Sequence, residues 1–426
     1  MVSIALFISL IVFLIVNVPV GIAIGLSSLS AIILNDRLSA TYIVQQLVTS
    51  ADSFPLMAIP LFILAGELMG SGGVSKRILN VCNVFFGRIT GGLAIVTVVV
   101  CMFFAAVSGS GPATVAAVGS MVVPTMLEKG YSKSFTLALI ATAGSIGVVI
   151  PPSIPMVIYG VSTNTSISGL FMAGFLPGFL IGIALIILCY FYCKKQGWKG
   201  EDYKYSAKEK LAAIWDAKWA LINPVIILGG IYGGIFTPTE AASVAAVYAL
   251  VCGLFIHREL DFRNMISTIG TACSTTGTTM VIIGCATAFT KILTIQKIPD
   301  MITNGIIGFT DNKIIILILI NVLLLIVGCF MDTTPAMMVL APILLPVALS
   351  FGMDPIHFGI IMVVNLSIGF ITPPLGINLF VASRIGREKL ETVTSGIVKF
   401  LIVMILCLLL ITYIPKIALL LPQTFM

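Results

Sequence analysis

Charged side chains are scarce in this 426-residue sequence, and that scarcity excludes a soluble protein. They make up 9% of the chain, against about 25% in soluble globular domains. Hydrophobic residues make up 59%, and the mean hydropathy is +1.15. The composition therefore predicts an integral membrane protein that faces the lipid bilayer. The net charge of +6 comes from lysines and arginines in the breaks between apolar runs, which excludes nucleic-acid binding.

Catalytic groups are missing as well. The two histidines, His257 and His357, lie at the ends of apolar runs, and no H-E-x-x-H, G-x-S-x-G or G-x-x-x-x-G-K pattern occurs. The nine cysteines form no C-x-x-C pair, and we interpret them as small core residues. The first apolar run, Val2–Leu34, lacks the basic segment and cleavage site of a signal peptide, so we expect it to be retained. We expect no enzyme, no catalytic residue and no ATP site.

The apolar runs of the first half are interrupted at recognisable places. A spanning helix needs about 20 apolar residues, so Val2–Leu34 can hold two short helices that turn near Pro19. Polar residues flank Ser53–Pro60 within the segment Ser39–Lys76, which predicts a re-entrant hairpin with its tip inside the bilayer.

The rest of this half contains a predicted broken helix and two further crossings. Gly92–Leu127 is long enough to cross but is interrupted at Ser108–Thr114, so we expect a broken helix there. Residues 135–160, interrupted near Pro151, and residues 169–193 complete the half.

A polar connector joins this half to the next. Residues 194–218 carry seven lysines, and the three tryptophans of the chain lie in or directly beside them. Ser206 and Glu209 have the spacing of a capping box, and apolar residues follow at helical spacing. The connector therefore predicts an amphipathic helix in the membrane interface.

The second half repeats the order of the first. A hairpin is expected at Arg263–Lys297 with its tip at Ser274–Thr279, followed by a break at Gly328–Pro335. At an offset of 222 residues, Pro124 matches Pro346 and the pair Pro151–Pro152 matches Pro373–Pro374. These matches predict a duplication, with residues 1–193 as the first repeat and 219–426 as the second.

Counting crossings predicts that the repeats are inverted. Two short helices and three crossings make five per half, an odd number, whereas one long tilted helix at the start would make four and parallel repeats. With five, one side of the membrane collects Arg37, Lys76, Arg77 and Arg88, and the other collects most of the basic residues, including the connector. The positive-inside rule makes that second side cytoplasmic.

Breaks at membrane depth mark candidate binding sites, because their unpaired backbone groups need protein or a water-filled cavity. Ser108–Thr114 supplies hydroxyls and close backbone approach, although a simple proline kink would look similar. Asp332 lies in a strongly apolar run, where a carboxylate needs a cation or a capping role. We favour structural roles for Glu67 and capping for Glu240.

Three motifs resemble a known family: Ser53–Glu67, Ser108–Gly119 and Gly369–Asn378. They are similar to the large membrane subunit of TRAP transporters, the tripartite ATP-independent periplasmic transporters, and the similarity covers essentially the whole chain. The resemblance implies an all-α polytopic membrane protein with an inverted repeat, two re-entrant hairpins and two broken helices, working as an elevator-type transporter. The mobile part would comprise about residues 50–165 and 263–385, with the remainder as scaffold.

The resemblance also implies function and partners. It implies Na⁺-coupled uptake of an organic anion in the bacterial inner (cytoplasmic) membrane, with sialic acid favoured and C4-dicarboxylates or other small carboxylates next. A periplasmic substrate-binding protein and a small four-helix membrane subunit would be the partners. A stand-alone sodium/dicarboxylate symporter and a passive anion channel are the alternatives.

The breaks and tips together give the predicted site residues. The Na⁺ ligands are expected among Ser53, Ser108, Gly109, Ser110, Gly111, Thr275, Thr276, Gly277, Gly328, Asp332 and Thr333. The substrate is expected near Thr114, Thr278, Pro335, Asn365 and Asn378. For the two asparagines, a cavity wall is favoured slightly over interhelical hydrogen bonding.

Overall fold

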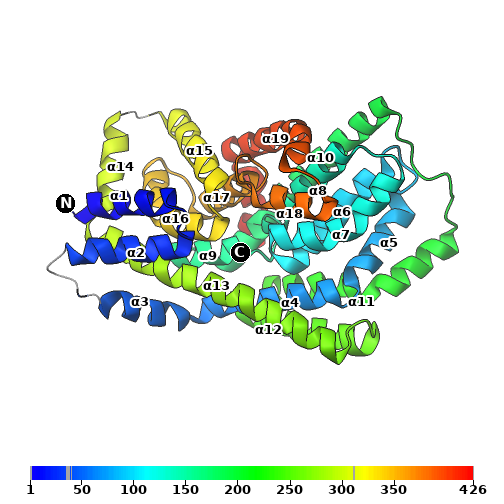
Figure 1. The fold of residues 1–426 in the computed structure, drawn as a ribbon, viewed down its shortest axis with the longest axis horizontal. Coiled ribbons are helices and arrows are strands. Elements are labelled where there is room, and N and C mark those ends of the chain that lie inside the picture. Colours follow the sequence, from blue (N-terminus) through cyan, green and yellow to red (C-terminus); the bar gives the residue numbers. More distant parts are fainter. Residues whose placement is uncertain (1, 35–38, 40, 310–311, 426) are drawn as a thin grey trace.

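The computed structural model describes residues 2–34, 39, 41–309 and 312–425, and these residues form helices without a strand. The helices of the first half are α1 (Val2–Ile15), α2 (Val20–Ile33), α3 (Thr41–Ala51), η1 (Phe54–Met57), α4 (Ala58–Ser71), α5 (Val74–Phe86), α6 (Gly92–Ser108), α7 (Gly111–Glu128), α8 (Lys133–Ser145), η2 (Ile146–Val148), α9 (Ile154–Thr163) and α10 (Ile167–Gln196). Figure 1 shows them interleaved with the helices of the second half in one elongated molecule.

The second half begins with α11 (Ala207–Tyr232). The remaining helices are α12 (Pro238–Val251), η3 (Cys252–Ile256), α13 (Phe262–Ile295), α14 (Ile298–Phe309), α15 (Lys313–Phe330), α16 (Thr333–Ser350), α17 (Pro355–Gly369), α18 (Ile377–Gly386), α19 (Leu390–Tyr413) and α20 (Lys416–Phe425). Within the described residues, eight helical segments are long and apolar enough to cross a membrane. The prediction of an all-helical polytopic membrane protein is confirmed.

The duplication is visible in the helices themselves. Both ends of α16 follow those of α7 at the 222-residue offset found in the sequence. Equivalent segments run in opposite directions. α8 begins beside the start of α19, where Lys133 pairs with Glu388, whereas α17 begins near α9, where the Tyr159 hydroxyl donates to the Pro355 carbonyl at 2.8 Å. The repeat is therefore inverted.

The predicted position of the second hairpin is wrong. Within the predicted hairpin 263–297, residues 263–295 belong to the continuous helix α13, which has Ser274–Thr279 in its middle. The threonine hydroxyls of this stretch bond back to their own helix, from Thr278 to the Ser274 carbonyl at 3.0 Å and from Thr279 to the Thr275 carbonyl at 2.9 Å. A polar run satisfied in this way does not need to break.

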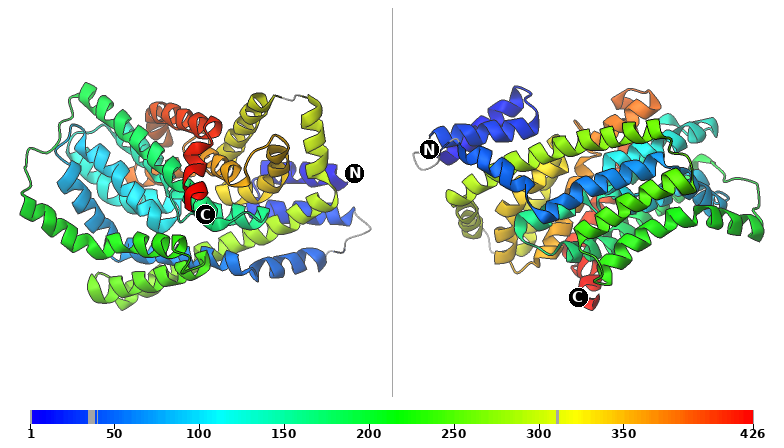
Figure 2. Two further views of the ribbon diagram at one scale, coloured as in Figure 1. Left: turned by 180° about the vertical axis from the view of Figure 1, so that it is seen from behind. Right: turned by 90° about the horizontal axis from the view of Figure 1, so that it is seen from below.

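The first predicted hairpin is also misplaced. Between residues 39 and 76, α3 and α4 are separated by a break at Ser53 and by η1, and both pack along α13. They continue in one direction instead of folding back, as Figures 1 and 2 show. The segment is a broken helix that lies beside the full length of α13.

The re-entrant hairpins lie where broken helices were expected. α6 and α7 turn at Gly109–Ser110 and pack against each other, and α15 and α16 meet at Met331–Asp332. The paired proline breaks interrupt α8–α9 and α17–α18 instead. In each half, the segment predicted as a hairpin crosses, and the segment predicted as a broken helix is the hairpin. The number of crossings per half therefore stays odd, and the two repeats are inverted as predicted.

The same exchange corrects the predicted distribution of basic residues. Arg77 pairs with Glu259 at 2.7 Å and with Asp216 at 3.6 Å, and the Arg88 carbonyl lies against Gly200 of the connector. Arg77 and Arg88 therefore lie on the same side as the connector, which increases the positive bias of that side. Arg37 lies outside the described residues.

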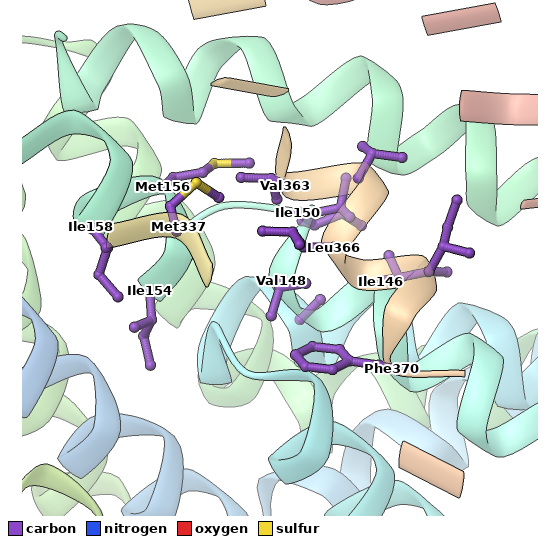
Figure 3. Packing of buried hydrophobic residues seen from close by; sticks show 14 of the residues in the cluster. Ile146, Val148, Ile150, Ile154, Met156, Ile158, Met337, Val363, Leu366 and Phe370 are labelled. Carbon is purple, nitrogen blue, oxygen red and sulfur yellow. The ribbon is translucent and has the colours of Figure 1, made fainter. Parts of the chain in front are cut away.

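Apolar packing holds the two repeats together at the centre. In Figure 3, Met156 of α9 lies beside Met337 of α16, and the ring of Phe370 lies near Val148. All four side chains are buried. This packing places the two hairpin tips on opposite sides of one cavity.

Candidate functional site

A central cavity of about 220 Å³ brings together the two hairpin tips. Helices α4, α9 and α13 close its sides. Its lining consists of Ser108–Ala113 from the first tip, Asp332–Thr334 from the second, Ile63, Gly66 and Glu67 from α4, Thr275 and Thr279 from α13, and Val148, Ile154, Pro155 and Phe370. Among these residues there is no lysine or arginine.

Hydroxyl groups organise the first tip. The hydroxyls of Ser108 and Thr114 lie 2.9 Å apart, and the Thr114 hydroxyl donates to the Ser110 carbonyl at 2.8 Å. Gly109 has a φ of +60°, which favours glycine, and Ser110 caps α7. The C-terminal end of α6 and the N-terminal end of α7 thus meet at the cavity, which offers carbonyls to a cation and N–H groups to an anion.

A carboxylate organises the second tip. Asp332 caps α16, and its Oδ1 accepts a hydrogen bond from the Thr333 N–H at 2.7 Å. The capping interpretation of Asp332 is therefore confirmed, whereas its predicted role as a Na⁺ ligand stays a prediction. Capping engages one carboxylate oxygen in this geometry, and no ion pair joins Asp332 to a described residue. The second oxygen is available to a cation in the cavity.

Glu67 is a cavity residue that the sequence argument missed. It projects from α4 into the lining, and its side chain has no hydrogen bond to any described residue. The sequence does contain a signal for this position, because Glu67 is a carboxylate within an apolar run. We interpret that signal above as a structural role and not as a binding role. With Asp332, it gives the cavity two carboxylates without a neighbouring cation, so the cavity attracts positive charge.

The cavity gathers seven of the predicted ligand residues and leaves out others. Ser108, Gly109, Ser110, Gly111, Thr275, Asp332 and Thr333 line it. Thr276, Gly277 and Thr278 lie elsewhere on α13. Gly328 instead lies against Gly369, where α15 and α17 approach closely. Ser53 belongs to a different cavity.

None of the residues predicted for the substrate lines the central cavity, and Thr278 is exposed on α13. Thr114 and Pro335 are buried just behind the tips. Asn365 donates to Asn321 Oδ1 at 2.8 Å, and Asn378 donates to the Ala141 carbonyl at 3.0 Å. Both asparagines thus join helices, so the interhelical interpretation, which was not favoured, describes them better than a cavity wall.

An inverted helical repeat with two hairpin tips at a central polar cavity defines a membrane transport protein. The family model described as "Tripartite ATP-independent periplasmic transporter, DctM component" matches residues 7–417. The chain therefore belongs to the DctM family of TRAP transporter permeases, as the sequence motifs indicated. It is a multi-pass membrane protein of a bacterial transporter family.

The names of similar proteins mention different substrates. An isethionate TRAP transporter permease of Oleidesulfovibrio alaskensis is 51% identical over 95% of this chain, which spans 64% of that longer protein. Two large permeases of Vibrio cholerae match over nearly their full lengths: one for C4-dicarboxylates is 41% identical over 99% of this chain and 97% of its own, and one for sialic acid is 37% identical over 96% of each.

A solved structure has a similar fold. The YdaH transporter of Alcanivorax borkumensis, described as having an unusual topology, aligns with a TM-score of 0.60 over 87% of this chain and 88% of its own at 16% identity. This likeness concerns the fold alone.

Proposed function

We propose that this chain is the permease of a Na⁺-coupled importer for a small organic anion. The observation that carries the proposal is the central cavity, which has two carboxylates and two hairpin tips but no lysine or arginine in its lining. Such a cavity binds an anion only weakly by itself. Bound Na⁺ would neutralise the carboxylates and supply the missing positive charge.

Na⁺ and substrate would use different parts of the same tips. The carbonyls at the end of α6 and the free oxygen of Asp332 suit Na⁺, which prefers oxygen ligands. The N–H groups at the starts of α7 and α16 suit a carboxylate or sulfonate. Because each ion improves the site for the other, their binding is linked, and each should raise the affinity of the other by the same factor.

The cavity favours a small anion. At about 220 Å³, it is smaller than the roughly 300–1,000 Å³ of sites for drug-sized ligands. The relative named for isethionate is 51% identical, and the one named for sialic acid 37%. We therefore rank a two- to four-carbon sulfonate or dicarboxylate ahead of the sialic acid favoured from the sequence.

The proposal includes the family's partners and an elevator movement. A periplasmic binding protein would deliver the anion, and a small four-helix subunit would accompany this chain in the inner membrane. We propose a mobile body with other bounds than the sequence suggested. It is formed by α6–α10 and α15–α19, which leaves out α4, α5, α13 and α14 and adds α10 and α19. The reason is that α4 packs along α12 and α13 packs along α2, so these long helices belong with the scaffold.

The test is a titration of the permease, purified with its small subunit, with isethionate, succinate and N-acetylneuraminate. We expect one anion to bind at least about tenfold more tightly in Na⁺ than in choline buffer. In liposomes, that anion should accumulate against its gradient only with Na⁺ and the binding protein. Equal affinity in both buffers would contradict Na⁺ coupling. Accumulation without the binding protein would indicate a stand-alone symporter, and equilibration without accumulation a channel.

A further inference from the structure

A second polar cavity lies further along the helices that line the first. It measures about 350 Å³ and is bounded by α3, η1, α9, α13 and α16. It shares Ser53, Val161 and Asn164 with a neighbouring cavity of about 470 Å³, which reaches the turn between α11 and α12 at Thr237. We call the two together the outer vestibule.

Three polar side chains in the 350 Å³ cavity of the vestibule have no partner among the described residues. Lys291 of α13, Ser53 before η1 and Asn164 after α9 line it, and none of their side chains forms a hydrogen bond or ion pair with a described residue. The threonines on the same face of α13 are satisfied; for example, Thr290 donates to the Met338 carbonyl at 3.0 Å. Of the residues that the structure describes, Lys291 is the one charged residue in the lining of either vestibule cavity.

The vestibule and the central cavity follow the same path. On α13, Thr279 lines the central cavity and Thr287 the vestibule, about 12 Å apart at 1.5 Å per residue. On α9, Pro155 and Val161 are related in the same way, about 9 Å apart. Two further segments line both cavities. One is α16, and the other is the continuous segment of η1, which lines the vestibule, and α4, which lines the central cavity.

The vestibule lies toward the face opposite the basic connector. α13 begins beside Ser71, which the Thr268 hydroxyl contacts at 3.2 Å, close to the Arg77–Glu259 pair. Lys291 is near the other end of this 34-residue helix. Because the basic side is cytoplasmic, Lys291 faces the side from which an imported anion arrives.

We propose that the outer vestibule is a second, low-affinity anion site in which Lys291 receives the carboxylate or sulfonate before it reaches the central cavity. Ser53 and Asn164 supply hydrogen-bond donors beside the ammonium group. A single lysine in a polar, water-accessible cavity attracts an anion without holding it, as a transient site requires. This proposal rests on the proposed uptake of an organic anion but adds a site outside the central cavity.

The transport test compares Lys291→Gln, which removes the charge, with Lys291→Arg, which keeps it. Lys297→Gln is the matched control, because Lys297 is an exposed lysine six residues on that lines neither cavity. We expect Lys291→Gln to raise the KM for uptake in liposomes roughly tenfold at low salt with little change in kcat. Lys291→Arg and Lys297→Gln should resemble the unchanged protein. An unchanged KM in Lys291→Gln would overturn the proposal.

A binding experiment separates the vestibule from the central cavity. In choline buffer, isethionate should bind weakly and in a salt-sensitive manner to the unchanged protein and to Ser108→Leu, but not to Lys291→Gln. Equal binding by Lys291→Gln would contradict the vestibule site. The higher KM of Lys291→Gln could also disappear in liposomes without anionic lipid. That result would mean that Lys291 binds lipid phosphates instead of the transported anion, and it would also overturn the proposal. If the unchanged protein transports no anion, the proposed function is wrong. The titration in choline buffer still shows whether the vestibule binds isethionate through Lys291.

Discussion

At the scale of single residues, Asp332 has one role that the structure shows, helix capping, and one that we propose, Na⁺ binding. It caps α16 through the Thr333 N–H, and it faces the central cavity. A cap uses one oxygen of the carboxylate, so the role in folding does not exclude a role in ion binding. The two roles can be separated experimentally, since asparagine caps helices as well as aspartate does.

Asp332→Asn should therefore fold normally but lose Na⁺ affinity. We expect the Na⁺ concentration for half-maximal uptake to rise roughly tenfold, because removing one favourable ion contact costs about 1.4 kcal/mol or more. Uptake measured as a function of Na⁺ concentration checks this.

Asp354→Asn is the matched control for this change. Asp354 caps α17 by accepting from the Ile356 and His357 N–H groups at 2.8 and 3.1 Å, and it does not line the central cavity. Uptake by Asp354→Asn should depend on the Na⁺ concentration in the same way as uptake by the unchanged protein. If uptake by Asp332→Asn and Asp354→Asn depends on Na⁺ concentration identically, Asp332 does not bind Na⁺.

At the scale of elements, close contact between α15 and α17 positions the second tip. A Cβ atom at Gly369 would lie 2.4 Å from the carbonyl carbon and oxygen of Gly328, far inside the contact limit for backbone atoms. Only glycine allows this approach. The contact lies one turn before Asp332, so it determines where the carboxylate stands.

Gly369→Ala should separate α15 from α17 and destabilise the protein. Overpacking of this kind costs about 1–3 kcal/mol, so we expect a lower midpoint in a thermal unfolding assay and reduced uptake. Gly270→Ala on α13, where an added Cβ would meet nothing within 4 Å, should be neutral or slightly stabilising. A Gly369→Ala protein as stable as Gly270→Ala would show that the contact is not required.

At the scale of the whole molecule, the connector between the halves is attached at its start. Glu201 accepts from Lys129 at 2.8 Å and from Asn83 at 3.2 Å, and its N–H donates to the Gly87 carbonyl at 2.8 Å. Trp198 packs on Tyr131 with ring centres 4.7 Å apart. Lys129 and Tyr131 belong to the α6–α10 body that we propose to move, whereas Asn83 lies on α5, which packs along α11. The start of the connector therefore links that body to α5.

The Glu201 contacts predict a pH dependence. The hydrogen bond from Lys129 lowers the pKa of the Glu201 carboxyl below its usual 4.5, although partial burial opposes the shift. A lowered folded-state pKa stabilises the folded protein above the pKa of the unfolded chain, and that contribution is lost as the pH falls through the folded-state value. The effect should be about 1 kcal/mol or less, since the pair is near the surface.

Glu201→Gln should therefore lower thermal stability slightly at pH 7, and the difference from the unchanged protein should shrink as the pH falls below 4.5 and through the lowered folded-state pKa. Asp202→Asn is the control, because Asp202 is an exposed neighbour in the same connector without an ion pair to a described residue. Unfolding midpoints from pH 3.5 to 7.5 check this. A difference that does not shrink toward the acidic end would attribute the effect to something other than the carboxylate charge.

The sequence by itself determined the features that depend on local pattern. Composition required a membrane protein, the proline and glycine offsets revealed the duplication, and the capping boxes at Ser206 and Thr237 formed as their spacing predicts. The breaks at Gly109 and Asp332 also lie where the sequence placed them. In each case the deciding interactions are within a few residues along the chain.

The tertiary structure decided which segments cross and which side chains meet. The threonine-rich stretch of α13 looks like a tip in sequence, but its hydroxyls bond within a helix that α2, α3 and α4 flank. Glu67 faces the central cavity and Ser53 joins Lys291 because of how helices distant in the chain pack. Local pattern shows that a polar group must be satisfied, but only packing decides whether its own helix, a neighbour or a cavity does so.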